Sequence, residues 1–203
     1  MADIATDELT RADQAFAGNR LLATFSREAR ALIEPFGTTI ELNPGETVLT
    51  RGEQVSATVF PVAGTMISMT VELSRGRSVE VASVGREGAV GGIVSCGHAP
   101  AFSRAEVLVP GEAFKVPMEA LEDAKKRSPF IANLFCRYSD YLLSQVMQSV
   151  ACNAFHSIAE RAARWLLHAQ DRAGLKRRSC ECYARLQAHY DEVIGVSGGS
   201  AGC

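Results

Sequence analysis

Hydrophobic positions change their spacing twice along the 203-residue chain, which divides it into an N-terminal, a middle and a C-terminal part. Residues 1–18 are polar and alanine-rich without a strong period, so we expect a mobile N-terminal arm there, either a frayed helix or a disordered segment. Between residues 19 and 36 apolar side chains recur at helical spacing. Ser26 is a suitable N-cap for a second short helix, and Pro35 and Gly37 end this helical stretch.

The middle part, residues 38–117, shows short apolar runs separated by turn residues. The spacing of about ten residues is typical of a sandwich or barrel of short antiparallel strands. Within the runs, apolar and polar residues alternate, which predicts one inward face on each strand. The inward positions are expected to be Val55, Ala57, Val59, Ile67, Met69, Val71, Val79, Val81, Ala105, Val107 and Val109.

Helical spacing returns after residue 118, and Ser128 followed by Pro129 predicts the start of a long helix over 128–152. This helix is apolar on more than one side, so it must be covered on more than one side. One face can lie on the β domain and the other on a second copy of the helix; complete burial within one domain is the alternative. As a dimer interface we assign Ile131, Leu134, Tyr138, Tyr141, Leu142 and Gln145.

The C-terminal part, residues 153–194, is predicted to be a residual helical segment. Ser157 and Glu160 form a capping box that starts one helix, and residues 180–194 form the last helix. Residues 195–203 are rich in glycine and serine, which predicts a flexible tail.

Charge and composition exclude several classes of protein. A net charge of −2 gives no overall attraction to nucleic acid or to an anionic membrane. No apolar run reaches the length of about 20 residues that a membrane span needs, and the acidic start does not resemble a secretory signal. We therefore expect a cytoplasmic protein without a membrane partner.

Cysteine and histidine are scattered along the chain. The six cysteines show no disulfide framework, and the pair Cys180 and Cys182 is by itself a weak metal signal. The sequence contains no nucleophile–base constellation, phosphate-binding loop or dinucleotide fingerprint. We predict no catalytic residue, no metal site and no cofactor, hence no enzyme, although a haem that needs a single His or Cys stays open.

Five stretches of the sequence, taken in order, carry a resemblance to a known family. They are Asn19–Ala23, Leu42–Glu53, Val59–Gly64, Val84–Gly88 and Ala159–Leu167. In this order they resemble the first helix, the first β-roll hairpin, the Phe/Tyr-Pro-x-x-Gly sequence before the next strand, the loop that enters the ligand pocket and the helix that leads to the DNA-binding domain. These are features of the Crp/Fnr regulators, bacterial relatives of the cyclic-AMP receptor protein. The resemblance implies an α+β fold: an antiparallel, jelly-roll-like β-roll of the cyclic-nucleotide-binding type, flanked by helices and followed by a long C-terminal dimerisation helix.

The same resemblance implies a sensor domain over residues 19–127 and a homodimer that binds DNA through a C-terminal winged helix-turn-helix. Residues 171–175 and 179–186 resemble the segment that follows the wing in such regulators. We therefore hypothesise that an internal deletion removed the helix-turn-helix. The chain would then be the sensor and dimerisation part of a transcription regulator, and DNA would be bound only through the domain that it lacks.

The family binds its effector with a Gly-Glu pair and an Arg-Ala pair. Ser103, Arg104 and Ala105 match the Arg-Ala side, whereas Glu87 precedes Gly88 instead of following it, which argues against cyclic AMP. We assign these five residues to a site for a small effector, for which Arg104 favours an anion.

Each assignment has an alternative. Arg104 can pair with Glu106 or Glu87, and the glycines between residues 85 and 92 can simply make a tight turn. A dimeric anion- or metabolite-binding module is the second candidate function. A cupin-type metalloenzyme is the third, but it needs two or three histidines on neighbouring strands and the β segment holds only His98.

Overall fold

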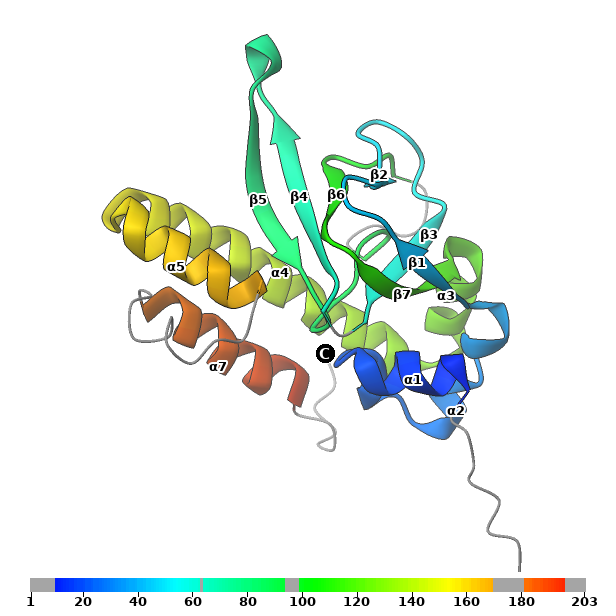
Figure 1. Cartoon of the computed structure of the whole chain (residues 1–203). Helices are drawn as coiled ribbons and strands as arrows, with labels where there is room; N and C mark the ends of the chain where they lie inside the picture. The colour runs from blue at the N-terminus through cyan, green and yellow to red at the C-terminus, as the bar shows by residue number, and fades with distance from the viewer. Residues whose placement is uncertain (1–9, 63, 94–98, 170–180, 196–203) are drawn as a thin grey trace, which may run out of the picture.

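The computed structural model describes residues 10–62, 64–93, 99–169 and 181–195, and it joins two antiparallel sheets to helices that precede and follow them (Figure 1). The strands are β1 (Thr38–Leu42), β2 (Thr47–Leu49), β3 (Ala57–Pro61), β4 (Met66–Glu72), β5 (Ser78–Val84), β6 (Arg104–Val109) and β7 (Gly111–Pro117). The α-helices are α1 (Arg11–Gly18), α2 (Arg27–Arg30), α3 (Met118–Arg127), α4 (Pro129–Phe155), α5 (Ile158–Ala169) and α7 (Glu181–Gly195). Three 3-10 turns, η1 (Leu22–Thr24), η2 (Glu34–Phe36) and η3 (Ser74–Gly76), complete the described elements. This architecture confirms the predicted α+β class, with a β-roll flanked by helices and a long helix after it.

The two sheets face each other across a hydrophobic core. One sheet has the strand order β1-β7-β3 and the other β2-β6-β4-β5. β7 pairs with β1 and β3 at the same time, with Thr38 opposite Lys115 and Ala57 opposite Pro117. Apolar side chains from both sheets fill the space between them, which is where the alternation of the sequence directs them. The buried members are Leu42, Val59, Ile67, Val84, Val90, Ala105, Val107 and Ala113.

The inward face predicted for β5 is wrong. The sequence places Val79 and Val81 inward, but Val79 is 46% exposed while Ala82 and Val84 are buried. The pairing of β4 with β5 shifts register at a β-bulge, and such a shift moves every following side chain to the other face. The outer half of the β4–β5 hairpin extends away from the rest of the roll (Figure 1), so its side chains have no core to face.

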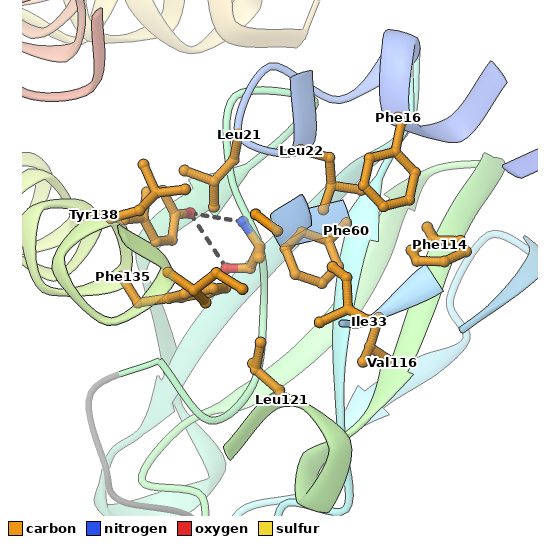
Figure 2. Close-up of a cluster of buried hydrophobic side chains, with 14 of the residues drawn as sticks. Phe16, Leu21, Leu22, Ile33, Phe60, Phe114, Val116, Leu121, Phe135 and Tyr138 are labelled. Atoms are coloured by element: carbon orange, nitrogen blue, oxygen red, sulfur yellow. Dashed lines mark hydrogen bonds between the residues drawn. The ribbon is translucent and has the colours of Figure 1, made fainter. Parts of the chain in front are cut away.

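A second hydrophobic cluster joins the N-terminal helices, β3, β7, α3 and α4 (Figure 2). Aromatic rings dominate it: Phe16 meets Phe114 edge to face at 5.4 Å, and Phe60 meets Phe135 at 6.2 Å. Such edge-to-face pairs add stability beyond the buried area. This cluster holds α4 against the roll along the first half of the helix.

Residues 11–18 form helix α1, which agrees with the helical alternative for this segment, but the helix packs on the domain and is not a separate arm. Ala15 and Phe16 are buried in the helical cluster. The sequence does not reveal this burial, because the segment is short and mostly polar and its few apolar residues do not form a helical period. The prediction for residues 1–9 lies outside the described residues.

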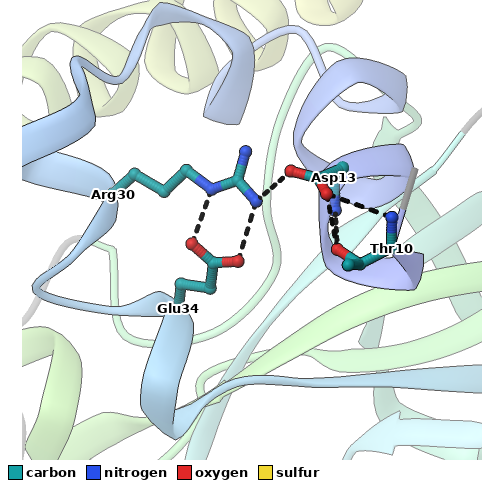
Figure 3. A network of polar contacts seen from close by, with 4 residues as sticks. All are labelled: Thr10, Asp13, Arg30 and Glu34. Carbon is teal, nitrogen blue, oxygen red and sulfur yellow. Dashed lines mark hydrogen bonds and ion pairs between the residues drawn. The ribbon is translucent and has the colours of Figure 1, made fainter. Parts of the chain in front are cut away.

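Polar contacts anchor α1 as well (Figure 3). The Thr10 hydroxyl accepts the Asp13 N–H at 3.2 Å and the Asp13 carboxylate accepts the Thr10 N–H at 3.0 Å, a complete capping box. Arg30 of α2 donates to the same Asp13 carboxylate and, through Nε, to Glu34 at 2.6 Å. Its guanidinium also lies 4.5 Å from the centre of the Phe16 ring. The Thr10 hydroxyl donates to the Asp13 carboxylate at 2.6 Å, and this bond, followed by those from Arg30 and from the Thr10 N–H, lowers the pKa of Asp13.

Helix α4 begins where the sequence predicts. Ser128 is its N-cap and accepts the Ile131 N–H, and Pro129 is the first helical residue. The helix continues to Phe155, three residues beyond the predicted end, and the extended backbone of His156 terminates it. No helix among the described residues is long and apolar enough to cross a membrane.

Among the described residues, helices α5 and α7 follow α4 and fold back along it (Figure 1). The predicted capping box of α5 is confirmed: Glu160 accepts the Ser157 N–H at 2.8 Å, and the Ser157 hydroxyl accepts the Glu160 N–H at 3.4 Å. α7 packs on α4 through the rings of Tyr190 and Tyr141, 4.8 Å apart. Residues 170–180 and 196–203 lie outside the described residues, so the deleted helix-turn-helix and the flexible tail stay predictions.

Candidate effector site

A cavity of about 270 Å³ lies where the open end of the β-roll meets α4. The loop after β5, the segment before β6 and one side chain of α4 form most of its wall. The described lining residues are Leu49, Val55, Met69, Ala89, Val90, Gly91, Gly92, Ile93, Ala99, Pro100, Ala101, Phe102, Ser103 and Leu142. None of these side chains carries a charge, and Ser103 supplies the one hydroxyl group among them. The cavity as described suits an uncharged, mainly apolar molecule.

Two glycines shape the wall of this cavity. Gly91 and Gly92 have φ angles of +100° and +61°, a region that residues with a Cβ rarely adopt. A Cβ on Gly91 would lie 2.4 Å from the Ala57 carbonyl oxygen, and one on Gly92 would lie 1.8 Å from Met118 Cε. The Thr58 hydroxyl donates to the Gly91 carbonyl at 2.8 Å. Both glycines are therefore needed for the tight turn, and both also line the cavity.

The loop that lines the cavity is bonded directly to α4. The Tyr138 hydroxyl accepts the Ala89 N–H at 2.9 Å and donates to the Ala89 carbonyl at 3.2 Å (Figure 2). Asn19 holds the same loop from the N-terminal side, because its amide donates to the carbonyls of Gly88 and Pro61 at 2.8 Å each. Burial of the Tyr138 hydroxyl raises its pKa well above the usual range, so it stays protonated and keeps both bonds.

Glu87 and Gly88, two of the predicted effector ligands, belong to the turn and not to the cavity. The Glu87 carboxylate accepts the Gly85 N–H at 2.9 Å, and burial raises the pKa of this carboxyl group. A Cβ on Gly88 would lie 1.8 Å from the Tyr138 hydroxyl, so glycine is required for the contact with α4. Neither residue is among those that line the cavity.

The three predicted ligands at the start of β6, Ser103, Arg104 and Ala105, face three different surroundings. Arg104 points to the outer face, where it pairs with Glu106 at 2.7 Å and donates to the Thr47 hydroxyl at 3.2 Å. This contact supports the ion-pair alternative for Arg104. Ala105 is fully buried in the core between the sheets. Ser103 alone of the predicted set lines the cavity.

Arg104 and Glu87 are not brought together. Arg104 pairs with Thr70 near the far end of β4, whereas Val84, just before Glu87, pairs with Ile67 near its beginning. These two positions are three residues apart on β4, and the two charges have different partners: Arg104 pairs with Glu106, and Glu87 accepts the Gly85 N–H.

The predicted dimer-interface residues lie inside the chain's own core, which corrects their assignment. Ile131, Leu134, Tyr138, Tyr141 and Gln145 are buried, and Leu142 is half-buried against the roll. The β-roll covers one part of this face and α7 covers the other. The N-terminal helices and β3 bury Ile131, Leu134 and Tyr138, and Tyr190 of α7 packs on Tyr141, so these side chains are not available to a second chain.

A different face of α4 is exposed and apolar. Leu143, Val146, Met147 and Val150 are between 37% and 66% exposed. Their spacing of three and four residues aligns them in one stripe along the helix. Leu143 and Met147 are among the residues that make the helix apolar on more than one side in the sequence, but the sequence does not show what covers this face.

The structure also gathers side chains that the sequence leaves scattered. Cys152 at the end of α4, His156 just after it and Cys182 at the start of α7 place their sulfur and nitrogen atoms within 4.8 Å of one another. The separation of 26 residues between His156 and Cys182 gave no sequence signal for this cluster.

Comparison with known proteins gives a match at the level of the fold. No protein-family model and no curated protein matches the chain. FixK2 from Bradyrhizobium japonicum is similar with a TM-score of 0.58 and 17% identity, over 82% of this chain and 89% of that one. A Ruegeria pomeroyi DSS-3 protein assigned as a cyclic nucleotide binding protein has a TM-score of 0.56 and 17% identity, over 94% and 92%. The sensor domain of the transcriptional regulator DNR from Pseudomonas aeruginosa has a TM-score of 0.51 and 16% identity, over 63% and 86%.

These likenesses define the class of fold first: a cyclic-nucleotide-binding-type β-roll with a long helix after it. The solved structures that share this fold are Crp/Fnr-type regulators and cyclic-nucleotide-binding proteins, as the sequence resemblance implies.

Proposed function

We propose that the chain is the sensor and dimerisation module of a Crp/Fnr-type transcription regulator that works in the cytoplasm and is not an enzyme. The observation that carries the proposal is the direct bond between the cavity and the long helix. Ala89 lines the cavity, and its backbone holds the Tyr138 hydroxyl on α4. The fold shared with FixK2 and with the sensor domain of DNR supports the same role.

The effector of this module is a small uncharged molecule. The described wall of the cavity presents aliphatic groups, glycine backbone and one serine hydroxyl, and Arg104 lies outside it in an ion pair. An anion in such a wall would lose its hydration without a partner charge, which costs several kcal/mol or more. The effector therefore differs from the anion that the sequence favours.

Effector binding acts on α4 through the loop between β5 and β6. A molecule against Ala89 and Val90 changes the position or mobility of this loop, and the Tyr138 hydroxyl transmits the change to α4. The exposed stripe around Met147 pairs with the same stripe of a second chain, so the signal reaches the dimer contact. Because the recognition helix of the family is not found by sequence, the chain itself does not bind DNA specifically.

The cavity can be tested with two small probes of opposite character, indole and cyclic AMP. In a methyl-labelled sample, indole is expected to give saturable NMR shifts at the methyl groups of Val90 and Ala101, and cyclic AMP is expected to give none. The Ser103→Trp variant fills the cavity and should abolish the indole shifts. Leu108→Trp is the matched control, because Leu108 lies on the outer face of β6, the strand that directly follows Ser103, and is 39% exposed.

The opposite result contradicts the proposal. Saturable binding of cyclic AMP at Val90 together with no response to indole would show a site for an anion. Equal indole shifts in the Ser103→Trp and wild-type chains would show that the probe binds elsewhere.

A further inference from the structure

Two buried cysteines and one histidine meet at the junction of α4 and α7. Cys152 is a residue of the last turn of α4, His156 follows that helix, and Cys182 is the second residue of α7. Both cysteines are fully buried, and the His156 side chain is 16% exposed. The two sulfur atoms and a ring nitrogen of His156 all lie within 4.8 Å of one another, and the Cys182 Sγ–His156 Nδ1 distance is 3.6 Å.

The spacing agrees with that of ligands around a tetrahedral metal ion. Zinc binds thiolate sulfur at about 2.3 Å and imidazole nitrogen at about 2.0–2.1 Å. At a tetrahedral angle these bond lengths separate the sulfur and nitrogen ligands by about 3.6 Å. The distance from Cys182 Sγ to His156 Nδ1 already has this value, and small side-chain rotations bring Cys152 to the same centre.

The surroundings of the cluster orient its atoms for metal binding. His156 Nε2 lies 3.3 Å from the Glu181 carboxylate, which favours a proton on Nε2 and leaves the lone pair of Nδ1 directed to the sulfur atoms. A carboxylate behind a ligating histidine is the usual outer partner in zinc sites. The Gln148 amide donates to Cys182 Sγ at 2.8 Å, a bond that stabilises negative charge on this sulfur.

We propose that Cys152, His156 and Cys182 bind a divalent metal ion of the zinc type and thereby fasten α7 to α4. Both thiols give up their protons when the ion binds, so two protons are released for each ion and affinity falls with acidification. Three protein ligands leave one position of a tetrahedron for a further ligand. The ion would secure the helix that covers the inner face of α4, and this role is independent of the effector cavity.

Cobalt(II) is a direct probe, because its visible spectrum reports tetrahedral geometry and bonds to thiolate. We expect the reduced full-length chain, freed of metal by a chelator, to bind one Co²⁺ with thiolate-to-metal charge-transfer absorption that Zn²⁺ abolishes by displacement. Cys182→Ser and His156→Gln should each weaken the affinity by about 100-fold or more, and Glu181→Gln by about tenfold. Cys136→Ser is the control, since Cys136 is an exposed cysteine on the same helix.

Three results would overturn the proposal. The first is absence of charge-transfer absorption in the wild-type chain at a Co²⁺ excess. The second is unchanged affinity in Cys182→Ser and His156→Gln, and the third is a loss in Cys136→Ser as large as theirs. His156→Gln keeps the test valid if a cysteine variant does not fold, because His156 lies at the edge of the core and its folding can be checked by circular dichroism.

Discussion

Tyr138→Phe removes a single oxygen atom that joins the cavity loop to α4. The hydroxyl bonds to both backbone groups of Ala89, at 2.9 and 3.2 Å, in a fully buried position. The ring stays in place, so the hydrophobic contacts are kept and the loss is that of two hydrogen bonds. A buried group left without its partner costs about 1–3 kcal/mol, so we expect the free energy of unfolding to fall by about 2 kcal/mol.

Tyr190→Phe is the matched control for this variant. The Tyr190 hydroxyl is also buried, but no described atom is within hydrogen-bonding distance of it. Removing an unsatisfied buried hydroxyl should leave stability unchanged or raise it. The two variants delete the same atom from the same kind of residue, and only Tyr138→Phe is expected to lower the free energy of unfolding.

Urea unfolding followed by circular dichroism and by the fluorescence of Trp165, the single tryptophan, measures both variants. With a slope near 2 kcal/mol/M, a loss of 2 kcal/mol lowers the midpoint by about 1 M. In a thermal scan the same loss corresponds to a decrease of about 4–8 °C for a chain of this size. The reasoning is refuted if Tyr138→Phe is as stable as Tyr190→Phe.

Two further perturbations test the half-buried Glu87 and the exposed stripe on α4. Burial raises the pKa of Glu87 above its ordinary value of 4.5, so the folded state favours the protonated form and stability falls as pH rises above about 4.5. Glu87→Gln should remove this part of the pH dependence and be at least as stable as wild type at pH 7.5. The prediction is contradicted if thermal scans between pH 4 and 8 show melting temperatures that change with pH in parallel in the variant and the wild type. Met147→Lys places a charge on the stripe and should weaken a dimer at least about tenfold in light scattering after size exclusion. Leu73→Lys on the β4–β5 hairpin is its control, and equal molar masses of the two variants would exclude the stripe as the dimer contact.

The effector site shows how a correct local pattern can still yield an incorrect site. Ala105 and Val107 point inward as their alternation predicts, and the same alternation requires Arg104 and Glu106 to point outward. The signal against Arg104 as a ligand was therefore present in the sequence. The cavity itself was not, because its wall combines segments from β2 to α4 whose proximity depends on how the sheets close.

The prediction of α4 also has one part that the local sequence supports and one part that it does not. The sequence predicts its start at Ser128 and its burial on more than one side, and both depend on residues within a few turns of each other. It does not show which partner covers which face. Tyr141 is covered by Tyr190 from α7, 49 residues later, and no periodic pattern within α4 contains that information.

The sequence by itself determined the features whose bonds are local: the alternation in β6, the N-cap at Ser128 and the capping box at Ser157. These features depend on neighbours a few residues away, so the local pattern of side chains is sufficient to predict them. Tertiary structure alone decided the exposed face of α4 and the Cys152, His156 and Cys182 cluster. Those features join residues far apart in the chain, and their distances are set by the packing of one element on another.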